Sequence, residues 1–196
     1  MFQQKFNMNL QESGMIIAFP DIVFILMGGF LGYFVDKKGK RGYLLAFGFI
    51  MLFFSHLTFY GYKACPDTPV KDKCYEGIFP MTLVGMSNTI IQITLYPVIN
   101  YIVKEKYFGT AYGILETACN LGMIIGSLLV GLILNIANGK EDQETDLLQY
   151  KQMHLTFIFI GLLGTLIAIA LNIYDRSSAG MNVLNTIFDR KARENN

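Results

Sequence analysis

Five stretches of the chain are apolar over about twenty residues or more, and short charged connections separate them. They cover residues 14–35, 43–62, 77–103, 111–137 and 155–174. A helix needs about 20 mostly apolar residues to cross the hydrocarbon core of a bilayer. Membrane β-strands would instead alternate in hydrophobicity over about 10 residues, and these stretches do not alternate. The sequence predicts an all-α integral membrane protein with five transmembrane helices within residues 14–174.

Charged residues are scarce and clustered. They make up 16% of the 196 residues, while hydrophobic residues make up 53% and the mean hydropathy is +0.39. Soluble domains carry about 25% charged residues. We therefore expect a lipid bilayer as the main surroundings, and a net charge of +1 gives no reason to expect a nucleic-acid partner.

The basic residues are unevenly distributed between the two sides of the predicted bundle. Ten Lys and Arg residues lie in the connection 36–42, the connection 104–110 and the tail 175–196, against six on the other side. Basic residues are enriched in cytosolic connections. We expect the tail 175–196 to be cytosolic and residues 1–13 to be a non-cytosolic segment.

Residues 32–41 form a short basic connection of the pattern G-x-x-x-D-K-x-G-K-R. We expect Gly32 to let another helix approach closely, and Gly39 to allow a tight reversal. Asp36 can cap the positive end of a neighbouring helix, and the basic side chains should stay in water. The pattern resembles the signature loop of the major facilitator superfamily of transporters in its glycine and aspartate, and a generic positive-inside connection is the simpler alternative. The candidate gating loop consists of Gly32, Asp36, Lys37, Gly39, Lys40 and Arg41.

A longer resemblance runs from Thr94 to the tail. The chain reads TLYPVINYIVKEKYFGTAYGILETACNLG, then GSLLVGLI, with VDKKGK upstream and YDRSSAGMNVLN downstream. It resembles the carboxy-terminal half of the lysosomal dipeptide transporters of the major facilitator superfamily, which are twelve-span uniporters for short peptides. The resemblance implies that the five stretches correspond to spans eight to twelve of a half-bundle, and that an accessory lumenal glycoprotein is a candidate partner.

In transporters of this kind the substrate lies between two halves near the midplane of the membrane. The resemblance therefore implies a fragment that forms one wall of a cavity, without span seven and the N-terminal half. It favours lysosomal or other endomembranes, with the plasma membrane as the alternative. The family has Trp-Pro at Tyr96-Pro97 and glutamine at Glu116, so the identity of the substrate stays open.

The third stretch is the most polar. Asn88, Gln92 and Tyr96 recur every four residues, which places them on one helix face. Amides and a phenol can hydrogen-bond a peptide backbone without selecting its side chains, so we expect them to line a dipeptide cavity. Hydrogen bonds between helices, worth about 0.6 kcal/mol each, are the alternative. Asn120 joins the candidates through the family match.

Two carboxylates lie within the predicted spans, where ionisable groups are costly and face water or the bundle interior. Asp21 follows Pro20 and could line the cavity, bind a proton or sit where water penetrates. Glu116 could pair with a basic residue of the cytosolic connections in a gating role, or be a plain interfacial carboxylate. We expect one of the two to be protonated during the transport cycle.

Cys65 and Cys74 flank a short connection on the predicted non-cytosolic side. Oxidising compartments permit a disulfide there, and two free thiols are the alternative. His56 is expected to pack or hydrogen-bond, and His154 to lie at a membrane edge. The sequence shows no catalytic Ser/His/Asp arrangement, phosphate-binding loop or metal-ligand spacing, so we expect no enzyme, no cofactor and no metal.

These observations favour a fragment of a transporter that moves small solutes, above all dipeptides, by alternating access. A transporter of a sugar or an organic anion is an alternative within the same superfamily. A non-transporting membrane subunit of a larger complex is an alternative from another class.

Overall fold

The computed structural model describes residues 6, 8–62, 75–136, 143–177 and 184–185, and the regular elements within these ranges are all helical. The five long helices are α2 (Leu10–Lys38), α3 (Arg41–Gly61), α4 (Ile78–Ile102), α5 (Phe108–Ile136) and α6 (Gln143–Ser177). Short 3-10 turns precede α4 at Tyr75–Gly77 and α5 at Glu105–Tyr107. Each long helix is long and apolar enough to cross a membrane. The predicted all-α fold with five spans is confirmed.

Two helices begin at least four residues earlier than hydropathy predicts. α2 begins at Leu10 because Asn9 and Glu12 form a capping box. The Asn9 side chain accepts from the Glu12 amide at 2.8 Å, and the Glu12 carboxylate accepts from the Asn9 amide at 3.1 Å. α6 begins at Gln143, well before residue 155. Its first turns lie outside the apolar part, Tyr150–Ser177, so hydropathy did not indicate them.

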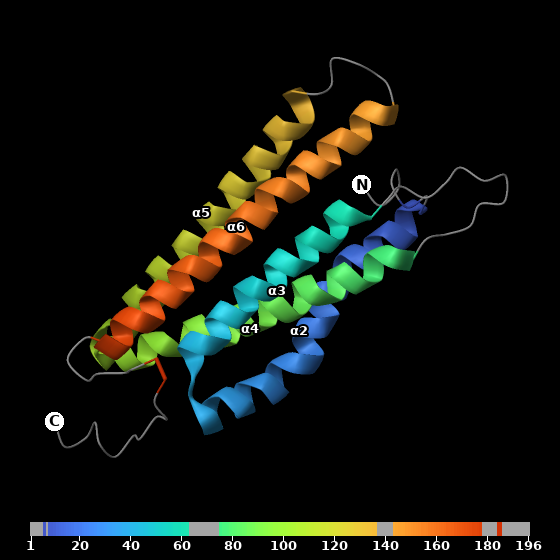
Figure 1. The fold of residues 1–196 in the computed structure, drawn as a ribbon. Helices are drawn as coiled ribbons and strands as arrows, with labels where there is room; N and C mark the ends of the chain where they lie inside the picture. Colours follow the sequence, from blue (N-terminus) through green and yellow to red (C-terminus); the bar gives the residue numbers. More distant parts are fainter. Residues whose placement is uncertain (1–5, 7, 63–74, 137–142, 178–183, 186–196) are drawn as a thin grey trace.

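The helices are arranged around α3, which packs against both α4 and α6, while α2 packs against the other side of α4 (Figure 1). α5 runs beside α6, and none of the residues in its apolar stretch Glu105–Ile133 is buried. α4 and α5 meet near the turn that joins them and diverge toward their other ends (Figure 1). One long side of α5 is therefore open within the described part of the chain.

Glycines allow the closest helix contacts. A Cβ at Gly85 of α4 would lie 2.8 Å from the Cα of Pro20 in α2. A Cβ at Gly161 of α6 would lie 3.0 Å from the backbone nitrogen of Phe53 in α3. In lipid, helix association depends on van der Waals contact and small residues at the interface, so these glycines determine how closely α2, α4 and the α3–α6 pair approach.

Two pairs of glycines, each spaced by four residues, lie away from such close contacts. No atom falls within 4 Å of a Cβ placed at Gly28, Gly32, Gly122 or Gly126. Their four-residue spacing places small residues on one face, but in the described part of the chain no neighbouring helix occupies that face. The expectation that Gly32 admits a closely packed helix is therefore wrong for this arrangement.

Buried hydroxyl groups tie α3 to α4. Ser55 of α3 donates to the carbonyl of Pro80 at 2.7 Å, and Ser87 of α4 donates to the carbonyl of Gly48 at 2.8 Å. Both serines are completely buried or nearly so. Because a buried hydroxyl without a partner costs free energy, these two hydrogen bonds also specify how the helices lie against each other.

Substitution of Gly85 by Ala tests the close contact between α2 and α4. The added methyl group meets the backbone of Pro20, so we expect a loss of about 1–3 kcal/mol of stability from overpacking. Gly122→Ala is the matched control, because nothing lies near that position and alanine favours a helix. Thermal unfolding in detergent should show a lower midpoint for Gly85→Ala only. Equal midpoints would contradict the close contact.

Candidate functional site

The predicted polar face of α4 is present and faces α5. Gln92 donates to the side-chain oxygen of Asn88 at 3.1 Å. One turn further, the hydroxyl of Tyr96 donates to Oε2 of Glu116 on α5. The structure therefore brings Asn88, Gln92, Tyr96 and Glu116 together in one polar zone, where the sequence predicted the first three as a group.

A second polar row runs along α5. Tyr112, Glu116 and Asn120 are four residues apart and so lie on one helix face. Tyr112 donates to the side-chain oxygen of Asn100 at 3.1 Å, and the rings of Tyr96 and Tyr112 are stacked with centroids 6.4 Å apart. Tyr112 lies opposite Asn100, and Glu116 lies opposite Tyr96. Residue numbers therefore rise along α5 as they fall along α4, as in a pair of antiparallel helices.

Asn120 occupies the next position of this register and is exposed on α5. Because α4 and α5 diverge from their shared turn (Figure 1), the paired polar groups lie near the turn. Farther from the turn, Asn88 of α4 is exposed as well. The arrangement offers amide, phenol and carboxylate groups to a polar ligand between the two helices.

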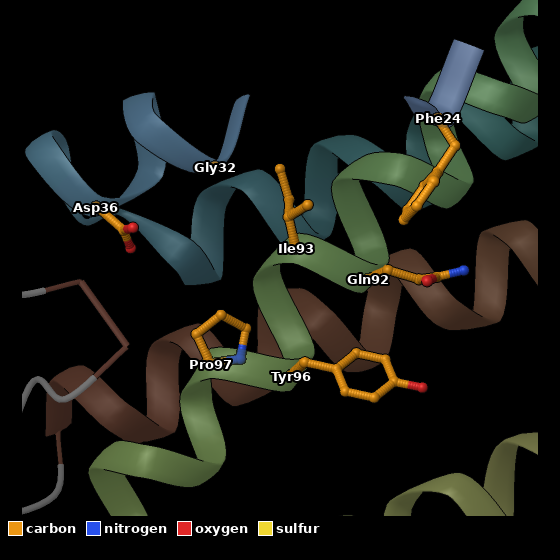
Figure 2. A pocket seen from close by; sticks show the side chains of 7 residues that line it. All are labelled: Phe24, Gly32, Asp36, Gln92, Ile93, Tyr96 and Pro97. Carbon is orange, nitrogen blue, oxygen red and sulfur yellow. The ribbon is translucent and has the colours of Figure 1, made fainter. Parts of the chain in front are cut away.

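A cavity of about 360 Å³ lies between α2 and α4. Figure 2 shows Phe24 extending from α2 toward α4, with Asp36 at the far end of the cavity, while Gln92 and Tyr96 extend together from α4. The volume of this cavity is within the range of small-molecule sites. The residues that line it are Phe24, Gly32, Asp36, Gln92, Ile93, Tyr96 and Pro97.

The basic loop between α2 and α3 contains two successive residues with left-handed backbone conformation. Gly39 has φ 65° and Lys40 has φ 56°. Glycine adopts such angles without strain, so the reversal expected at Gly39 is confirmed, whereas Lys40 was not expected to share it. The side chains of Lys37, Lys38 and Lys40 are exposed, as predicted.

Arg41 departs from the prediction that the basic residues of the loop stay in water. Only 1% of its side chain is exposed, and it forms a salt bridge with Asp36 at 3.1 Å. Asp36 therefore contacts the first side chain of α3 rather than capping backbone amides of a neighbouring helix. Arg41 is buried because the carboxylate and a returning segment of the tail enclose it.

This returning segment, Leu184–Asn185, was missed from the sequence. The carbonyl of Leu184 accepts from the Arg41 amide at 2.9 Å, and the Leu184 amide donates to Asp175 at 3.0 Å. The side chain of Asn185 donates to that of Asn172 at 2.7 Å. These contacts join the loop, the end of α6 and the tail into one unit. The YDRSSAGMNVLN string contained the residues, but no periodicity indicated that the chain turns back.

The predictions for the two carboxylates and the two cysteines have different outcomes. Asp21 is exposed on α2 and does not line the cavity. Glu116 accepts from a phenol instead of pairing with a basic loop residue, because Tyr96 lies directly opposite on α4. Cys65 and Cys74 lie outside the described residues, so their disulfide stays a prediction.

The two histidines meet across α3 and α6. Their Nδ1 atoms are 3.3 Å apart, and their rings stack on Phe157 and Phe59 with centroids at 4.8 and 4.9 Å. His154 is 2% exposed. The aromatic contact between α3 and α6 thus encloses His154 close to the start of the apolar part of α6, Tyr150–Ser177, and its place at a membrane edge stays a prediction.

Comparison with known proteins adds the wider context. The family model described as the Major Facilitator Superfamily matches residues 1–186. A mouse protein named lysosomal dipeptide transporter MFSD1 is 25% identical over 193 residues, which are 98% of this chain and 36% of that protein. The human and chicken proteins of the same name are each 26% identical over 134 residues, 68% of this chain and 26% and 28% of their own lengths.

The chain thus spans about a third or less of the length of the curated relatives it matches. No solved structure matches the chain.

Substitution of Asn172 by Ala tests the unit formed by loop and tail. It removes the acceptor of the Asn185 hydrogen bond, worth about 1 kcal/mol. We expect about fivefold faster hydrogen exchange at the amides of Arg41 and Leu184. Arg176→Ala, which changes an exposed residue near the end of α6, should leave both rates unchanged. Unchanged exchange in Asn172→Ala would show that the tail contact does not depend on this hydrogen bond.

Proposed function

Since the chain belongs to the Major Facilitator Superfamily, we propose that it forms one wall of the substrate path of a transporter that moves small solutes by alternating access. In such transporters two bundles rock around a site at their interface near the membrane midplane. The proposed wall consists of the facing sides of α4 and α5 together with the cavity between α2 and α4. The correspondence of the five helices with spans eight to twelve belongs to this proposal.

A single observation carries the proposal. α5 crosses the membrane with none of the residues in its apolar stretch buried, and yet it presents Tyr112, Glu116 and Asn120 on one face. Polar groups at membrane depth face water or protein rather than lipid. A polar row on an open helix side, opposite a second polar row on α4, is what one wall of a water-filled path requires.

Short peptides, and dipeptides above all, are the proposed substrates. The relatives named as lysosomal dipeptide transporters support this. The chemistry also supports it, because Asn88, Gln92 and Asn120 offer amides that can both donate to and accept from a peptide backbone. The cavity of about 360 Å³ lies within the range of sites for small molecules.

We also propose that the loop of Asp36 to Arg41 lies in the cytosol and acts in gating. Its contact with Leu184–Asn185 supports a cytosolic tail as well. The uneven distribution of basic residues supports this orientation. We propose in the same way a lysosomal or other endomembrane location. The proposed partners are the remaining part of the transporter and an accessory lumenal glycoprotein.

Uptake by the complete transporter in proteoliposomes tests the function. We expect uptake of labelled Ala-Ala and none of glucose or of an organic anion such as lactate. Uptake of glucose or lactate without Ala-Ala would contradict the peptide proposal. Absence of uptake of all three by a folded protein would favour a non-transporting subunit.

Gln92→Leu tests the polar face of α4. Loss of hydrogen bonds to a peptide backbone, each worth about 0.5–1.5 kcal/mol, should lower kcat/KM for Ala-Ala by up to about tenfold. Thr58→Val, whose hydroxyl bonds within α3 to the Phe54 carbonyl, should leave uptake unchanged. If Gln92→Leu keeps the full rate, Gln92 only stabilises the helix contacts.

A further inference from the structure

The two histidines of the chain lie on different helices, 98 positions apart, and meet in the folded bundle. His56 lies near the end of α3 at Gly61, and His154 lies near the start of the apolar part of α6 at Tyr150. Their Nδ1 atoms are 3.3 Å apart. α3 and α6 run side by side (Figure 1), and the pair lies toward the end of α3 that is opposite to the basic loop.

Aromatic rings determine how the two imidazoles face each other. The His56 ring stacks on Phe157 of α6, with centroids 4.8 Å apart, and the His154 ring stacks on Phe59 of α3 at 4.9 Å. His154 and Phe59 are each 2% exposed. Each histidine is thus positioned by an aromatic ring of the opposite helix, and the contact between the Nδ1 atoms joins the two helices.

The Nδ1 contact is compatible with only some protonation states. One Nδ1 must carry the hydrogen and the other must accept it, since a neutral imidazole has one donor and one acceptor nitrogen. One additional proton can bind to Nε2 of the donor ring and leave this hydrogen bond intact. A second would place two N–H groups and two positive charges face to face. The closed pair therefore holds at most one additional proton, whereas two separated histidines hold two.

Other elements also pack against this pair. α5 borders Phe157 with the apolar residues Leu129 and Val130, and α2 and α4 reach Phe59 through an apolar cluster. The titratable groups at this end of these helices whose side chains the structure describes are Glu12, Tyr60, Tyr62, Glu76, Tyr150 and Lys151. They contribute to the electrostatic potential at the pair, but a distance of 3.3 Å leaves no room for any of them between the two Nδ1 atoms.

We propose that His56 and His154 form a proton-sensitive latch between α3 and α6. The closed latch is favoured at neutral pH, and the open arrangement is favoured in acid because it binds one more proton. This difference raises the ratio of open to closed latch by up to about tenfold for each unit that the pH falls. Histidine suits this role, since its charge ordinarily changes between about pH 5 and pH 8.

The latch goes beyond the proposed transport function and does not require it. In the orientation proposed above, it lies at the non-cytosolic end of the bundle and so responds to the acidity of a lumen. Acid then loosens the contact of α3 with α6 at that end. The other end of the same two helices is joined by the contacts of Arg41 and Asn172 with the tail, which contain no histidine, and it stays closed.

Distances between spin labels on the full chain in detergent test the latch. The three cysteines of the chain are replaced by serine, and labels are attached through Leu57→Cys on α3 and Leu155→Cys on α6, both at exposed positions. At about pH 7.5 we expect one short distance. At about pH 5 a second, longer distance should appear, and the ratio of open to closed molecules should rise at least about tenfold.

Two controls separate the histidines from a general effect of acid. His56→Phe combined with His154→Phe keeps two stacked rings but removes the titrating groups, so the short distance should persist at both pH values. Labels at Tyr43→Cys and Tyr174→Cys, which are exposed positions toward the other ends of α3 and α6, should show the same distance at both pH values in the chain with both histidines.

Each outcome decides for or against the latch. A distance in the chain with both histidines that does not change with pH would overturn it. An equal change in the double phenylalanine variant would also overturn it, since other groups would then cause the opening. If that variant does not fold, ¹⁵N NMR of the two histidines replaces it. Two imidazolium rings that appear together with the longer distance support the latch, and two that appear while the distance stays short overturn it.

Discussion

The need to satisfy polar groups inside lipid organises this chain. Hydrophobic side chains gain little from leaving lipid for a helix interface, so polar contacts and close packing decide how the helices are arranged. Several hydroxyl groups meet the requirement within their own helix, as Thr165 does with the carbonyl of Gly161 at 2.8 Å. Ser55 and Ser87 meet it across α3 and α4. The amide and carboxylate side chains on the facing sides of α4 and α5 differ from these hydroxyl groups. They have more hydrogen-bonding capacity than their contacts within the described residues use.

The two sides of α4 both contain polar residues but differ in how these residues are hydrogen-bonded. Thr89 and Thr94 are buried and bond back to carbonyls of their own helix, so the side toward the bundle is polar in composition but satisfied. The side with Asn88, Gln92 and Tyr96 contacts α5 through the hydrogen bond of Tyr96 to Glu116. Both sides of α4 contain polar residues, so composition alone does not distinguish structural from functional groups on this helix. Their hydrogen-bond partners do distinguish them.

Much of the fold could be predicted from the sequence, because length and hydropathy are local properties. The five spans and the polar face of α4 follow from them. Three features could not be predicted in this way. The return of Leu184–Asn185 to Arg41 and the contact of His56 with His154 depend on residues far apart in sequence. The glycines in close contact, such as Gly85, could not be told from open ones such as Gly122, because spacing indicates a face but not its neighbour.

The candidate gating loop and the polar face of α4 are physically connected. Asp36, at the end of α2, and Gln92 and Tyr96, on α4, line one cavity. Asp36 is also bound to Arg41, which the tail encloses. Because Asp36 lines the cavity that Tyr96 also lines, a displacement of the loop would change the volume beside Tyr96. The Tyr96 hydroxyl in turn donates to Glu116. In the proposed cycle, the gating loop and the polar face of α4 would therefore both shape the cavity between α2 and α4.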